Sequence, residues 1–103
     1  MNDERIRGLL GLCQRAGKLK TGVEMVESAV KMGGGKLALM DAGIAPRGRK
    51  TIHDACAYAN VPFGELREAL IAEAIGKPGR MAVCVMDAGF AKKIRELLSE
   101  TNT

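Results

Sequence analysis

Residues 81–98 read MAVCVMDAGFAKKIRELL, and this stretch decides the class of fold. Its first six residues, MAVCVM, are all apolar, which is typical of a strand that is covered on both faces. Asp87 is a favourable N-cap residue. The apolar residues that follow it recur at helical spacing, namely Phe90, Ile94, Leu97 and Leu98. A buried strand followed by an amphipathic helix predicts an α/β fold with helices packed on a sheet.

The same two patterns continue toward the N-terminus. We expect helices over residues 3–16, from Thr21 to the glycines at 33–35, from the 45–50 turn to Ala59 and over 66–75. We also expect a short strand at 37–40 and a second one that begins with Val61-Pro62-Phe63. Asn2 or Asp3 would cap the first helix and Gly17 would end it. Thr21-Gly22-Val23-Glu24 has the form of a capping box at the start of the second helix. Alternation of strands and helices predicts a layered sandwich with both faces of the sheet covered.

The length and composition suit one folded domain. The chain has 103 residues, of which 47% are hydrophobic, so we expect a single domain over residues 1–103. No apolar run is long enough to cross a membrane, and the start MNDERIRG lacks the apolar region of a secretory signal. We therefore expect a soluble, cytoplasmic protein without membrane association.

Positive charge is concentrated in one third of the chain. The net charge is +4, but residues 15–50 contain eight basic and three acidic residues, which makes that segment +5 and the rest −1. A localised positive field favours a polyanionic partner, nucleic acid above all. The alternative is a solvated surface without a partner. The three aromatic residues argue against a module that stacks several bases on aromatic rings.

Catalytic and metal-binding patterns are weak. Three cysteines without a C-x-x-C pair, Cys13, Cys56 and Cys84, are expected to be reduced and buried. His53 precedes Cys56 by one helical turn, but Cys56 falls on the apolar stripe, where a thiol is neutral and inert. The glycine-rich stretches at 33–37 and 76–80 precede strands, whereas a phosphate-binding P-loop precedes a helix. We expect no enzymatic activity, no cofactor and no metal.

Several stretches together resemble a known family. They are LLGLCQRAGK at 9–18, TG at 21–22, AYANVP at 57–62, and AIGK at 74–77 with VMDAGFA at 85–91. In this order and spacing the chain resembles the kink-turn-binding L7Ae/L30e ribosomal protein superfamily, in particular its small bacterial YlxQ-like branch. The resemblance implies a three-layer α-β-α sandwich with a small, mixed, four-stranded sheet. It also implies RNA binding by one end of that sandwich.

The resemblance places the RNA-facing end at the start of the second helix and at the loops 41–47 and 76–80. The candidate RNA-binding residues are Lys18, Lys20, Thr21, Gly22, Glu24, Met25, Ser28, Arg47, Gly76, Lys77 and Arg80. Physical chemistry supports the same end, because a helix N-terminus offers unpaired amides and Gly22 lets a phosphate approach the backbone. Cationic side chains around it would add full positive charges.

The chain departs from the family at the positions that recognise a kink-turn. Typical members read roughly Gly-x-Asn-Glu-x-x-Lys there, whereas this chain has Gly22, Glu24, Met25 and Ser28. Glu24 repels phosphate, and Met25 offers no useful hydrogen bond. We therefore expect a small non-catalytic protein that binds structured RNA, with ribosomal RNA and a ribosome or translation-factor association as the favoured setting. The alternative is a protein–protein interaction module that keeps the fold without strong RNA binding.

Overall fold

The computed structural model describes residues 2–100, which form five helices and four strands. In chain order these are α1 (Asp3–Arg15), β1 (Leu19–Thr21), α2 (Val23–Lys31), β2 (Leu37–Asp41), α3 (Pro46–Ala59), β3 (Phe63–Leu66), α4 (Leu70–Ile75), β4 (Ala82–Val85) and α5 (Ala88–Glu100). The strands form one sheet in the order β1-β4-β2-β3. β2 and β3 are parallel, whereas β4 is antiparallel to β1 and to β2, so the sheet is mixed.

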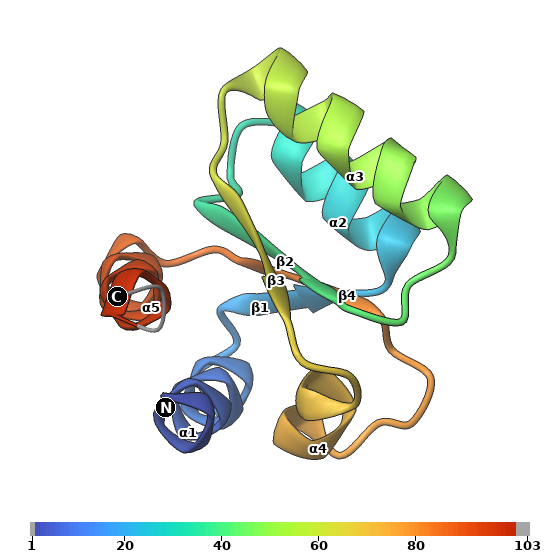
Figure 1. Ribbon diagram of the computed structural model, residues 1–103. Coiled ribbons are helices and arrows are strands. Elements are labelled where there is room, and N and C mark those ends of the chain that lie inside the picture. Colours follow the sequence, from blue (N-terminus) through green and yellow to red (C-terminus); the bar gives the residue numbers. More distant parts are fainter. Residues whose placement is uncertain (1, 101–103) are drawn as a thin grey trace.

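Helices cover the sheet on both faces (Figure 1). α2 and α3 pack on one face, and α1, α4 and α5 lie on the other. Because neighbouring residues of a strand point to opposite faces, Leu37 and Leu39 of β2 join the core under α1, α4 and α5, while Ala38 and Met40 join the core under α2 and α3. The predicted three-layer α-β-α sandwich with a mixed four-stranded sheet is confirmed.

The start of α2 differs from the expected capping box. Thr21 is the last residue of β1, where it pairs with Val83, and no side chain caps the helix. Gly22 occupies the N-cap position instead, and its amide donates a hydrogen bond to the carbonyl of Ala82 at 2.9 Å. Pairing with β4 satisfies this stretch of backbone, so the local capping pattern in the sequence was misleading.

The segment between α3 and α4 also differs from the expectation. The strand expected at 61–63 runs from Phe63 to Leu66, and the helix expected at 66–75 begins at Leu70. Leu66 pairs with Asp41 of β2 and is buried, so parallel pairing with β2 extends the strand into the predicted helix. Ala69 then reverses the chain in a left-handed conformation, with φ of 72°.

Of three other helix-end signals, those at Asp87 and Gly17 are confirmed and the one at Asn2 is wrong. The carboxylate of Asp87 accepts a hydrogen bond from the amide of Phe90 at 2.9 Å, which is the expected cap of α5. Gly17 follows α1 with φ of 73°, in the conformation that glycine provides at a helix end. Asn2 lies at the N-cap of α1 but does not cap it; its side-chain amide donates to the carbonyl of Leu97 instead.

Candidate nucleic-acid interface

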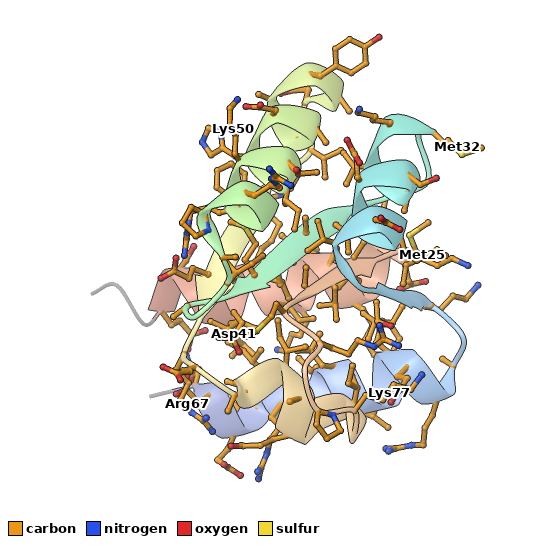
Figure 2. The ribbon with its side chains drawn as sticks, turned by 90° about the vertical axis from the view of Figure 1, so that its right-hand side faces the viewer. Met25, Met32, Asp41, Lys50, Arg67 and Lys77 are labelled. Atoms are coloured by element: carbon orange, nitrogen blue, oxygen red, sulfur yellow. The ribbon has the colours of Figure 1, made fainter. Side chains whose placement is uncertain are left out.

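Three loops meet at the end of the sheet where β4 begins. Because β4 is antiparallel to both its neighbours, its start lies beside the last residues of β1 and β2. Two backbone hydrogen bonds mark the junction: Gly22 donates to Ala82 at 2.9 Å, and Asp41 donates to Met81 at 2.8 Å. The β1–α2 turn, the 42–45 loop and the 76–81 loop therefore gather on the right of Figure 1, the side that faces the viewer in Figure 2. We call this side of the molecule, formed by the three loops, the loop end.

Gly22 and Arg80 form the centre of this end. Gly22 has φ of 96° and ψ of 146°, a region that essentially only glycine adopts. The position that a Cβ atom would take at Gly22 lies 3.5 Å from the Nη1 atom of Arg80, so the guanidinium packs over the bare backbone. Since α2 starts here without a side-chain cap, its first amides and its partial positive charge are available to an anion.

The start of α3 lies next to the start of α2. A Cβ atom at Gly48 of α3 would come within 3.3 Å of the Cγ2 atom of Val23, the first residue of α2. α3 also lacks a side-chain cap and begins with Pro46, which pre-sets the helical backbone angle. Arg47 is exposed in the first turn of α3. Two helix N-termini thus point toward the same end of the molecule.

The cations of this end have no ionic partner among residues 2–100. Arg47, Lys77 and Arg80 are exposed, and none of them makes an ion pair with another residue of the 2–100 segment. Glu24, also exposed in the first turn of α2, is the acidic candidate residue at this end. Figure 2 places Lys77 on the side of the end opposite to α2 and α3. The candidate residues at this end therefore carry three positive charges and one negative charge.

Asp41 has a structural role that the sequence analysis missed. Its side chain is 2% exposed, and its two oxygens accept hydrogen bonds from the amides of Gly43 at 2.7 Å and Ala69 at 2.8 Å. The Asp-x-Gly spacing of residues 41–43 was a signal for the first of these bonds, because aspartate commonly accepts from the amide two residues later. Both oxygens are thus used in shaping the loop.

The structure divides the candidate RNA-binding residues into three groups. Thr21, Gly22, Glu24, Arg47, Gly76, Lys77 and Arg80 belong to the end just described. Lys20, Met25 and Ser28 instead line a hollow along the outer side of α2. Lys18 lies at the opposite end of β1, where its carbonyl accepts a hydrogen bond from the amide of Met86. Gly76 ends α4 with φ of 67°, which assigns it a role in loop geometry.

A groove between α2 and α3 was also missed by the sequence analysis. It has a volume of about 760 Å³, and Arg47 lines it at the loop end of α3. Two ion pairs border it, Lys31 with Glu27 at 2.9 Å and Lys50 with Asp54 at 2.6 Å. Hydrogen bonding within the second pair raises the pKa of Lys50 and lowers that of Asp54. The groove is therefore lined by charges that largely compensate each other.

The cysteines belong to the core, as predicted. Cys13, Cys56 and Cys84 are at most 1% exposed and are not joined in disulfides. Burial raises the pKa of all three thiols, to about 11 for Cys13 and Cys84, so they stay neutral near pH 7. The ring of His53 packs edge-on against Phe63 with centroids 4.8 Å apart. Cys56 therefore lacks the exposed, activated state of a nucleophile.

Residues 2–100 offer neither a metal site nor a membrane span. Within that segment no three His, Cys, Asp or Glu side chains are grouped so that they could hold a metal ion. No helix of the same segment is long and apolar enough to span a membrane.

The fold and its basic loop end define a small α-β-α sandwich protein with two uncapped helix N-termini beside exposed cations. The chain belongs to the Ribosomal protein L7Ae/L30e/S12e/Gadd45 family, whose model matches residues 4–95. It is 37% identical over 98 residues to the RNA-binding protein YlxQ of Enterococcus faecium, a match that covers 94% of each chain. It is 35% identical over 91 residues to the RNA-binding protein YlxQ of Bacillus subtilis strain 168, covering 87% of this chain and 91% of the relative. The resemblance drawn from the sequence is thus confirmed.

Solved structures agree with the fold. A protein of unknown function from Bacillus halodurans superposes with a TM-score of 0.86 at 33% identity, over 91% of this chain and 96% of the other. The 15.5kD RNA binding protein of Giardia lamblia superposes with a TM-score of 0.75, over 97% of this chain and 88% of the other. At 14% identity, the second likeness concerns the fold alone.

Proposed function

We propose that this protein binds structured RNA, including ribosomal RNA, through the loop end of the sandwich and carries out no catalysis. The observation that carries the proposal is the guanidinium of Arg80 over the bare backbone of Gly22, at the uncapped start of α2. A phosphate at this point would meet helix amides and a full positive charge together. The two relatives named RNA-binding protein support RNA as the polyanion.

The side chains of this end favour phosphate contacts over the reading of base edges. Arg47, Lys77 and Arg80 are unpaired within residues 2–100 and can each neutralise one phosphate. Glu24 repels a phosphate that approaches the first turn of α2 from its exposed side. Met25, farther along the outer side of α2, offers a base only a weak thioether acceptor. Binding is therefore directed by the shape and the charge of a folded RNA. Specific recognition of a kink-turn is not part of the proposal.

The test is the salt dependence of affinity for a structured ribosomal RNA fragment. With about four phosphates contacted, the logarithm of the association constant should fall with the logarithm of salt at a slope of about −3. Lys77→Gln combined with Arg80→Gln should reduce the steepness by about 1.5. The matched control, Lys92→Gln with Lys93→Gln, removes two exposed charges from α5 and should leave the slope nearly unchanged. No binding at low salt, or equal effects of the two pairs of substitutions, would contradict the proposal.

A further inference from the structure

The outer side of α2 carries an apolar hollow that the RNA-binding proposal does not use. The hollow has a volume of about 360 Å³ and is lined by Lys20, Met25, Ser28, Ala29, Met32, Gly34 and Met86. We call it the methionine hollow. Met25 is 51% exposed and Met32 is 84% exposed. Figure 2 shows both on the side of α2 that faces away from α3, separate from Lys77 at the far side of the loop end.

The methionine hollow lies beside an open sheet edge. β1 is the outermost strand on its side of the sheet, and within residues 2–100 no strand pairs with its outer edge. The amide of Met86 donates to the carbonyl of Lys18, and the amide of Gly22 donates to the carbonyl of Ala82. The backbone N–H and C=O groups at positions 18, 20 and 22 therefore point toward β4. Because this direction alternates along an antiparallel strand, the amides and carbonyls of Leu19 and Thr21 point to the open edge. An extended peptide can pair with them.

The charges beside this edge select the kind of strand that can be added. Lys20 pairs with Cys84, whose side chain lies in the core under α2, so Lys20 projects on the α2 side of the sheet. Lys18, two residues earlier, projects on the same side. Both lysines are exposed, and neither makes an ion pair within the described segment. A second copy of this edge, paired around Lys20, would place lysine opposite lysine, which is unfavourable.

We propose that β1 and the methionine hollow together bind an extended segment of a partner protein that carries acidic and apolar side chains on one face. The segment adds to the sheet as a new strand next to β1. An Asp or Glu lies across from Lys20, and Leu- or Met-like side chains two residues away enter the hollow. Flexible, polarisable methionines adapt to such apolar side chains. An RNA strand matches this surface less well, because it has no strand-like backbone to pair with Leu19 and Thr21. This surface would act in addition to the RNA-binding end.

The probe is a pair of acetylated, amidated heptapeptides, TLTDTLT and TLTKTLT, which differ only in the central residue, acidic in the first and basic in the second. Binding is followed by NMR on the full chain with labelled amides and methionine methyl groups. TLTDTLT should shift the amides of Leu19 and Thr21 and the methyls of Met25 and Met32 in a saturable manner. It should bind about fivefold more tightly than TLTKTLT, because opposite charges across strands attract and like charges repel.

Two variants assign the binding to the hollow. Met32→Asp should weaken TLTDTLT binding at least about fivefold, because it places a charge in the apolar hollow. The matched control is Leu12→Asp on α1, where Leu12 is 50% exposed but lies outside the hollow, and this variant should bind TLTDTLT normally. Met32→Asp should also retain RNA binding with an unchanged salt slope, so that the RNA-binding end and this surface are tested separately.

Three results would overturn the inference. One is equal affinity for the two peptides, or shifts that avoid β1 and the methionine methyls. Another is a response of Met25 and Met32 to ribosomal RNA in the absence of any response to TLTDTLT, which would assign the hollow to RNA. The last is concentration-dependent dimerisation detected at the amides of Leu19 and Thr21 without peptide, which would assign the edge to a second copy of this chain.

Discussion

The carboxylate of Asp41 accepts a hydrogen bond from the backbone amide of Ala69 at 2.8 Å, across 28 positions of sequence. Its other oxygen accepts from the amide of Gly43 at 2.7 Å. One buried side chain therefore joins the loop after β2 to the turn before α4. Ala69 holds a left-handed backbone with φ of 72°, an uncommon conformation for a residue other than glycine. The shape of the loop end depends on this link.

Asp41→Asn should lower the free energy of unfolding by about 1–3 kcal/mol. An amide side chain has one oxygen and one NH₂ group, so one of the two backbone amides would face a donor instead of an acceptor. Urea unfolding followed by circular dichroism measures the change. Asp54→Asn is the matched control, because Asp54 is exposed and its ion pair among residues 2–100 is with the exposed Lys50, so its effect should be much smaller. If the two variants were equally stable, the hydrogen bonds accepted by Asp41 would not contribute to the stability of the fold.

Gly22→Ala should reduce RNA affinity as well as stability. Its φ of 96° and ψ of 146° lie in a region that essentially only glycine adopts, so alanine there costs about 1–3 kcal/mol of folding free energy. The new methyl group would also lie between the backbone and Arg80. Gly33→Ala is the control, since Gly33 has φ of 92° and open space around it at the other end of α2. Both variants should lose stability by urea unfolding, because both positions have a positive φ, but only Gly22→Ala should lose RNA binding in a filter or fluorescence assay. Similar RNA affinities for the two would count against contact at Gly22.

Glu24→Asn with Ser28→Lys should raise affinity for a standard kink-turn by about 1–3 kcal/mol. Both residues are exposed and lie one turn apart on α2, so the new side chains can reach the same RNA. The double substitution restores polar groups that can contact bases and phosphate. Affinity is compared by titration with a duplex of the same length that lacks the kink.

The control for added charge is Glu96→Asn with Ser99→Lys on α5, where both residues are also exposed. It makes the same charge change on α5 instead of α2. It should raise the affinity for both RNAs only slightly and by the same factor. If Glu24→Asn with Ser28→Lys strengthens binding to the kink-turn and to the duplex by the same factor, the outer side of α2 does not dock a kink-turn.

The buried thiols should make stability depend on alkaline pH. Burial raises the pKa of Cys13 and Cys84 from 9.0 to about 11 in the folded protein, while the unfolded chain keeps the ordinary value. Their contribution to the free energy of unfolding is therefore complete below pH 9 and falls as pH rises toward 11. Urea unfolding between pH 8 and 11 measures this loss, and Cys13→Ala with Cys84→Ala should show a shallower loss.

At pH 8 a thiol reagent should react with the native protein far more slowly than with the urea-unfolded chain. Fast labelling of the native protein would contradict the burial.

The sequence by itself determined the layers of this protein. Residues such as Phe90, Ile94 and Leu97 recur at helical spacing, and the MAVCVM run marks a central strand, because long elements bury enough apolar surface to leave a periodic pattern. The resemblance to the family also pointed to the loop end, where seven of the eleven candidate residues lie. The cysteines were also assigned correctly, since an apolar stripe predicts burial directly.

The tertiary structure decided what depends on contacts between distant residues. β1 has three residues, too few to show an alternating pattern, and its pairing partner lies more than sixty positions away. The same pairing overrides the capping pattern at Thr21, and pairing with β2 extends β3 to Leu66. The packing of Arg80 over Gly22, the link from Asp41 to Ala69 and the methionine hollow arise in the same way. Local sequence patterns report which face of an element is buried, but only the folded chain determines which exposed faces come together.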